Sequence, residues 1–130
     1  MKTVLIIEDN EADQFLGELT IQRVRPDVQV LKAADGQEAL DMLAENGIEP
    51  DLILLDINMP RMNGHEFLEA YSNNNERQIP VVVMLTSSDQ ERDKEQASGY
   101  HCVKDYLLKP IKPETVEDLQ KIYDKAYASE

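Results

Sequence analysis

The sequence predicts a doubly wound α/β protein, in which helices cover both faces of a five-stranded parallel sheet. Two observations predict this class. Short apolar runs alternate along the chain with segments of helical spacing, which is the pattern of parallel strands joined by helical crossovers. Most of these runs are continuously apolar, as in strands that are buried on both faces. The 130 residues suit one domain, and we expect residues 1–130 to form it without a linker.

Five segments have the character of strands. Three of them are continuously apolar and are expected at the centre of the sheet, whereas residues 28–31 alternate and suit an edge. The strands are predicted at residues 4–7, 28–31, 52–55, 81–85 and 106–108. Right-handed crossovers limit how such units stack, and five strands suit the flavodoxin-like order 2-1-3-4-5 better than the six-stranded alternative.

The segments between the strands have helical spacing. The first helix is expected to bury a stripe made of Ala12, Phe15, Leu16 and Leu19. Comparable stripes mark three further helices, at Ala39, Leu40 and Leu43, at Phe67, Leu68 and Tyr71, and at Val116, Leu119, Tyr123 and Ala126. Residues 89–98 are almost wholly polar, so that a helix there would be weakly anchored.

Charge and composition exclude several classes of protein. The formal net charge is -13, from 26 acidic and 13 basic side chains, and such a field repels nucleic acid and anionic lipid. No apolar run approaches the roughly 18 residues of a membrane span, and the N-terminus lacks the features of a signal peptide. Cys102 is the only cysteine, which excludes an internal disulfide. We therefore expect a cytoplasmic protein that binds neither nucleic acid nor membrane.

Residues that can carry chemistry follow the predicted strands. Glu8 and Asp9 follow the first strand and Asp56 the third, while Thr86 follows the fourth and Lys109 the fifth. In the predicted order these strand ends meet at the edge where open α/β sheets bind ligands. Clustered carboxylates repel one another unless a cation lies among them, and an all-oxygen set suits Mg²⁺. Lys109 and Thr86 suit phosphoryl oxygens, and Asp56 is the natural nucleophile, because carboxylates are established covalent acceptors.

Five motifs surround these positions in a fixed order. They are VLIIEDN at 4–10, DLILLDINMP at 51–60, NG at 63–64, PVVVMLT at 80–86 and DYLLKP at 105–110. Each motif is weak alone, but together and in this order they are highly specific. By them the chain resembles the response-regulator receiver family of two-component signalling over nearly its whole length. None of the positions that define the family departs from its pattern.

The resemblance implies a role for each residue of the acidic edge. Asp56 would be the phosphoacceptor. Asp9 would bind Mg²⁺ directly and Glu8 largely through water, while Asp56 and the backbone carbonyl of Asn58 would complete the protein's share of the ligands. Lys109 would pair with a phosphoryl oxygen.

The resemblance also implies a conformational switch. Thr86 would move toward the phosphoryl group, and Tyr106 would rotate inward behind it. Asn58 and Ser88 stand where the family tunes hydrolysis, and their small side chains would leave a path for water, so that the phosphoryl group is not expected to last many hours. The surface formed by residues 89–98, the last strand and the last helix would then change its affinity for a partner.

As a member of this family the chain would be a signalling protein rather than an enzyme, catalysing only its own phosphorylation and dephosphorylation. Its donor would be a phosphohistidine on a sensor histidine kinase or a phosphotransfer protein, with Mg²⁺ and Lys109 offsetting charge in a loose, in-line transition state. Only one helix is predicted after Lys109, which leaves no room for an output domain. The effector would therefore be a separate protein, or the chain would belong to a phosphorelay; a homodimer stays open.

Three other functions compete. A haloacid-dehalogenase-type phosphatase also uses an aspartyl nucleophile and Mg²⁺, but it needs a second aspartate where this chain has Asn58, and no cap insertion is present. A flavodoxin needs a phosphate-binding loop after the first strand, where residues 8–11 would repel the phosphate of FMN. The serious alternative is a phosphorylation-independent scaffold or interaction module, and the intact acidic edge argues against it.

Overall fold

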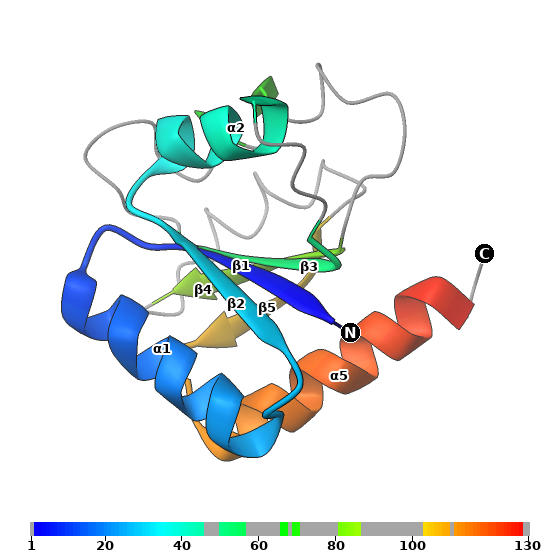
Figure 1. The fold of residues 1–130 in the computed structure, drawn as a ribbon. Helices are drawn as coiled ribbons and strands as arrows, with labels where there is room; N and C mark the ends of the chain where they lie inside the picture. Colours follow the sequence, from blue (N-terminus) through cyan, green and yellow to red (C-terminus); the bar gives the residue numbers. More distant parts are fainter. Residues whose placement is uncertain are drawn as a thin grey trace.

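The computed structural model describes residues 2–45, 50–56, 66–67, 69–70, 81–86, 103–109 and 111–128. The elements, in chain order, are β1 (Thr3–Ile7), α1 (Glu11–Val24), β2 (Gln29–Ala33), α2 (Gly36–Glu45), β3 (Leu52–Asp56), β4 (Val81–Thr86), β5 (Val103–Leu108) and α5 (Pro113–Ala128) (Figure 1). The polar segment 89–98 lies outside the described residues. No helix in the described ranges is long and apolar enough to cross a membrane.

The five strands form one parallel sheet in the order β2-β1-β3-β4-β5, which confirms the predicted topology. The winding of the chain reverses between β1 and β3, whose register pairs Ile7 with Leu55. Glu8 and Asp56 each follow one residue later, so that both reach the same edge of the sheet. The register of these two strands therefore brings the acids together.

The other end of the same strand pair is fixed by Asp51. Its carboxylate accepts hydrogen bonds from the backbone N–H groups of Lys2 and Thr3, at 2.7 and 3.0 Å. Its own backbone N–H donates to the carbonyl oxygen of Thr3 at 2.8 Å. Three hydrogen bonds thus hold the start of β1 against the start of β3.

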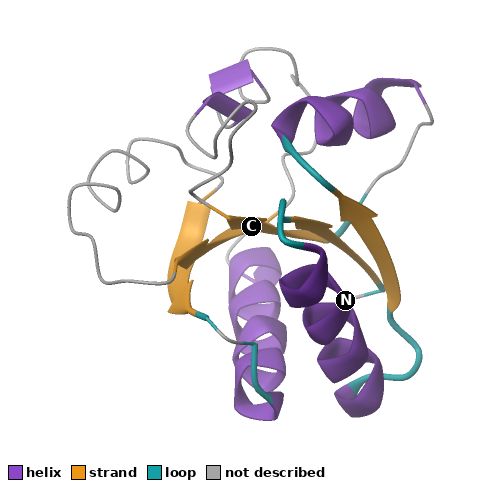
Figure 2. Ribbon diagram, turned by 90° about the vertical axis from the view of Figure 1, so that its left-hand side faces the viewer, coloured by secondary structure: helices purple, strands orange, loops and turns teal. Residues whose placement is uncertain are grey.

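Side chains alternate along the strands and form one hydrophobic cluster on each face of the sheet. Helices α1 and α5 cover the face that carries Ile6 and Leu85, and α2 covers the other face together with helical residues at 66–67 and 69–70 (Figure 2). Phe67, one of these, is fully buried, as predicted. The three central strands are buried on both sides, which confirms the interpretation of their continuous apolar runs.

The predicted face of α1 is wrong, although the helix itself is confirmed. Phe15 and Leu16 are 58% and 52% exposed, and the residues that the helix buries are Gly17 and Ile21. A Cβ atom at Gly17 would lie 3.0 Å from the Cδ1 atom of Ile111, so α1 packs through a residue that has no side chain. The spacing of apolar side chains gives no sign of a contact made through a glycine. The stripe predicted from that spacing was therefore the wrong face of the helix.

The two edge strands differ from prediction in their bounds. The last strand was expected at 106–108, but β5 begins at Val103 because an edge strand tolerates the polar residues that precede Tyr106. The second strand is an edge strand, as its alternation predicted, and it runs two residues further than expected, to Ala33.

Candidate functional site

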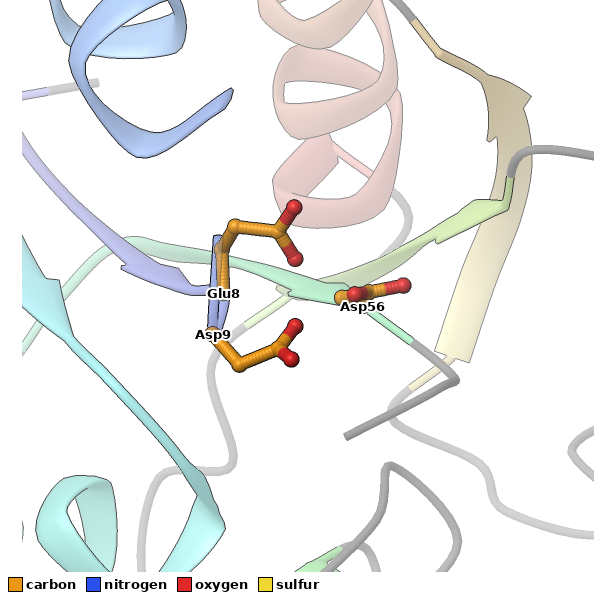
Figure 3. Close-up of side chains that lie close together, drawn as sticks. All are labelled: Glu8, Asp9 and Asp56. Atoms are coloured by element: carbon orange, nitrogen blue, oxygen red, sulfur yellow. The ribbon is translucent and has the colours of Figure 1, made fainter. Parts of the chain in front are cut away.

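Three carboxylates meet at the carboxyl ends of β1 and β3. Each of Glu8, Asp9 and Asp56 offers an oxygen, and these oxygens lie within 4.8 Å of one another (Figure 3). Glu8 and Asp56 are buried, at 2% and 5% exposure, whereas Asp9 is exposed. The structure therefore brings together the three acidic side chains that the sequence placed at this edge.

Lys109, which follows β5, is the cation of this site within the part of the chain that the structure describes. Its Nζ atom forms ion pairs with Glu8, with Asp13 at 3.4 Å and with Asp56 at 3.4 Å. The Lys109 side chain is only 18% exposed, so these pairs are partly shielded from water. A single ammonium thus faces three carboxylates, with Asp9 as a fourth acid beside them.

The pKa values of Glu8 and Lys109 reflect this crowding. Burial, together with the nearby Asp56, raises the pKa of Glu8 from 4.5 to about 9, although Lys109 acts in the opposite direction. Burial lowers the pKa of Lys109, but its hydrogen bond to Glu8 and the charges of the surrounding acids outweigh that effect and raise it overall. Lys109 therefore stays positively charged, while the metal-free site favours a proton on Glu8.

The arrangement fits a hard divalent cation. Glu8 Oε2 is buried and has no hydrogen-bond partner among the described residues. Such an atom is costly to bury unless something binds it. All three candidate ligands are carboxylates, which suits Mg²⁺ or a similar ion, and a divalent charge would offset their mutual repulsion.

Two residues of α1, Asp13 and Gln14, contribute to the site although the sequence did not predict them. Asn10 caps the helix by accepting a hydrogen bond from the backbone N–H of Asp13, which places Asp13 near Lys109. The side-chain amide of Gln14 donates to the carbonyl oxygens of Glu8 and Ala33, at 3.1 Å each, and so ties the ends of β1 and β2 together. The signal in the sequence is the capping residue, because an Asn cap fixes where the next turn begins.

The remaining predicted residues are described only in part. Thr86 ends β4 opposite Leu108, and its backbone alone is described. Tyr106 is half-buried and packs against the hydrophobic cluster on the α2 face of the sheet. Asn58 and Ser88 lie outside the described residues, so their contributions to metal binding and hydrolysis stay predictions.

Comparison with known proteins gives a consistent result. Residues 4–121 match the response regulator receiver domain. The chain is 31% identical to the protein PilH of Pseudomonas aeruginosa over 116 residues, which are 89% of this chain and 92% of PilH. The crystal structure of a two-component response regulator from Legionella pneumophila has a TM-score of 0.85 and 32% identity, covering 96% of this chain and 99% of that one. The phosphorylated cyanobacterial phytochrome response regulator RcpA has a TM-score of 0.78 and 29% identity, covering 95% and 91%.

Proposed function

This chain belongs to the response regulator receiver domain family of two-component signalling, and from that membership we propose that it accepts a phosphoryl group on Asp56 in a Mg²⁺-dependent reaction. The donor is a phosphohistidine on a partner histidine kinase or phosphotransfer protein. The observation that carries the proposal is the position of Asp56, a buried carboxylate within reach of Glu8, Asp9 and Lys109. RcpA, a relative with the same fold, is known in a phosphorylated form.

In the proposed reaction a carboxylate oxygen of Asp56 attacks the phosphorus atom. The P–N bond of the phosphohistidine breaks, and the imidazole nitrogen keeps the electron pair. Lys109 supplies a positive charge to the phosphoryl oxygens, and Glu8, Asp9 and Asp56 would hold the Mg²⁺ ion. When bound, Mg²⁺ offsets the negative charge of the transferring group. Water later hydrolyses the acyl phosphate and restores Asp56.

The output follows from the roles expected of Thr86 and Tyr106. We propose that both respond to the phosphoryl group and change the surface that includes β5, α5 and residues 89–98. The match covers 92% of PilH, so this relative is little longer than the matched region, and it covers 99% of the chain in the Legionella crystal structure. By analogy, we propose that residues 1–130 act as a single receiver domain and that a separate effector protein reads the surface.

The deciding experiment uses the whole chain and a small phosphodonor. Incubation with acetyl phosphate and Mg²⁺ is expected to add one phosphoryl group, which intact-mass measurement detects and peptide mapping assigns to Asp56. A chelator should prevent the gain in mass. A phosphorylation-independent scaffold predicts no gain under either condition, and that result would overturn the proposal.

Mg²⁺ binding is expected to strengthen as the pH rises from about 6 to about 8, by up to about tenfold per pH unit. Glu8 holds a proton below its raised pKa of about 9, and the ion needs the deprotonated carboxylate, so binding releases a proton. For the same reason the metal-free fold should lose stability as the pH rises from 4.5 towards 9. Calorimetric titration in two buffers of different ionisation enthalpy measures both the affinity and the proton release.

The variant Glu8→Gln serves as the control for this pH dependence. It removes the titrating group and should flatten the dependence while weakening the binding itself. Equal affinity at both pH values in the unmodified protein would contradict the assignment of Glu8 as the proton carrier.

A further inference from the structure

Lys109 is shared between the proposed reaction site and helix α1. Its ammonium forms ion pairs with Glu8, with Asp13 at 3.4 Å and with Asp56 at 3.4 Å. An ammonium has three N–H donors, and in the described structure three carboxylates lie within ion-pair distance of it. A phosphoryl oxygen on Asp56 would therefore compete with Glu8 and Asp13, which already accept hydrogen bonds from this ammonium, for its N–H groups.

The three acceptors are not equivalent. Glu8 is buried and pairs with Lys109, so losing that contact would leave a carboxyl oxygen without a partner in a dry environment. Asp56 carries the incoming group itself. Asp13 is 46% exposed, so water can replace the ammonium at little cost. Asp13 is thus the contact that gives way most readily.

The backbone holds Asp13 in this position. Asn10 caps α1 through the N–H of Asp13, and the Asp13 side chain borders the small hollow that Glu8 and Lys109 also line. Its carboxylate therefore has two effects on the reaction. It attracts Lys109 toward α1, and it adds negative charge where a phosphoryl donor has to approach.

We propose that Asp13 is a positioning residue that holds Lys109 in its resting arrangement and thereby slows phosphoryl uptake. The inference rests on the proposed function of Asp56. It predicts that the rate of phosphoryl uptake rises when Asp13 is neutralised. The same change removes a charge that attracts the metal ion. Rate and metal affinity should therefore move in opposite directions.

The test compares Asp13→Asn with Glu11→Gln in the whole chain. Both variants remove one negative charge from the first turn of α1, but of these two acids only Asp13 forms an ion pair with Lys109 in the described structure. With acetyl phosphate at saturating Mg²⁺, Asp13→Asn is expected to label about two- to fivefold faster than the unmodified protein, as the loss of one exposed ion pair allows. Glu11→Gln should label at nearly the unmodified rate.

Two further readouts separate positioning from a structural role. Asp13→Asn should bind Mg²⁺ more weakly in calorimetric titration, and its advantage in rate should shrink as salt rises from about 0.05 to about 0.5 M. Asp13→Glu keeps the charge and should restore both the slower rate and the stronger binding. A merely structural loss would lower rate and affinity together and would not be rescued in this way.

The outcomes are distinguishable. If the unmodified protein labels but Asp13→Asn labels no faster than Glu11→Gln, the role of Asp13 is wrong while the proposed function stands. If the unmodified protein does not label with Mg²⁺ present, the proposed function fails and this inference fails with it.

Discussion

Replacing Asp56 by asparagine is expected to abolish phosphoryl uptake and, without metal, to stabilise the fold. The amide has the same shape as the carboxylate but is not a competent nucleophile, so no acyl phosphate forms. Asp56 lies beside Asp9 and Glu8, so its neutralisation relieves repulsion with Asp9, and with Glu8 wherever Glu8 has lost its proton. We expect a gain of about 1 kcal/mol in the free energy of unfolding, measured by thermal melts in chelator.

The matched control for this variant is Asp51→Asn. Asp51 lies at the opposite end of the same strand, where it accepts hydrogen bonds from Lys2 and Thr3. This substitution should destabilise the fold by roughly 1 kcal/mol and leave phosphorylation intact. Labelling of Asp56→Asn at the rate of the unmodified protein, with the phosphoryl group mapped to another residue, would show that the nucleophile has been misassigned.

Replacing Lys109 by methionine is expected to slow phosphoryl transfer by about 10²–10³-fold at saturating Mg²⁺. Methionine has a similar length but no charge, so the phosphoryl oxygens lose the ammonium that lies 3.4 Å from Asp56. The variant should also bind Mg²⁺ more tightly, because Lys109 and the ion compete for Glu8. Rates of labelling with acetyl phosphate and calorimetric titration measure the two effects.

Lys32→Met provides the comparison for this substitution. Lys32 pairs with Glu18 at 3.2 Å on the surface of the molecule, and its loss should alter neither labelling nor Mg²⁺ binding appreciably. Should Lys109→Met label at a rate close to that of Lys32→Met, the ammonium would have no part in stabilising the transferring group.

Much of the fold could be predicted because the sequence signals are local. The apolar runs before Glu8 and Asp56 mark central strands, and the order of the strands follows from handedness rules. Since parallel strands end at a common edge, the sequence alone predicts that the acids that follow them lie together.

What could not be predicted depends on how elements pack. The buried face of α1 is determined by the approach of Ile111 to Gly17, a contact between residues far apart in the sequence. Similarly, Asp13 reaches Lys109 across a large separation along the chain. The cap at Asn10 indicates where α1 begins, but only the tertiary structure shows which charge its first turn faces.

The hydrogen bonds at the two ends of β1 have a consequence for the speed of metal capture. Asp51 holds the beginning of this strand, and Gln14 holds its end through the carbonyl oxygen of Glu8. Neither anchor requires an ion, so the backbone beneath the carboxylates is preorganised before any ion arrives. Association should therefore need only the reorientation of side chains and the loss of water from the cation, without a slow refolding step.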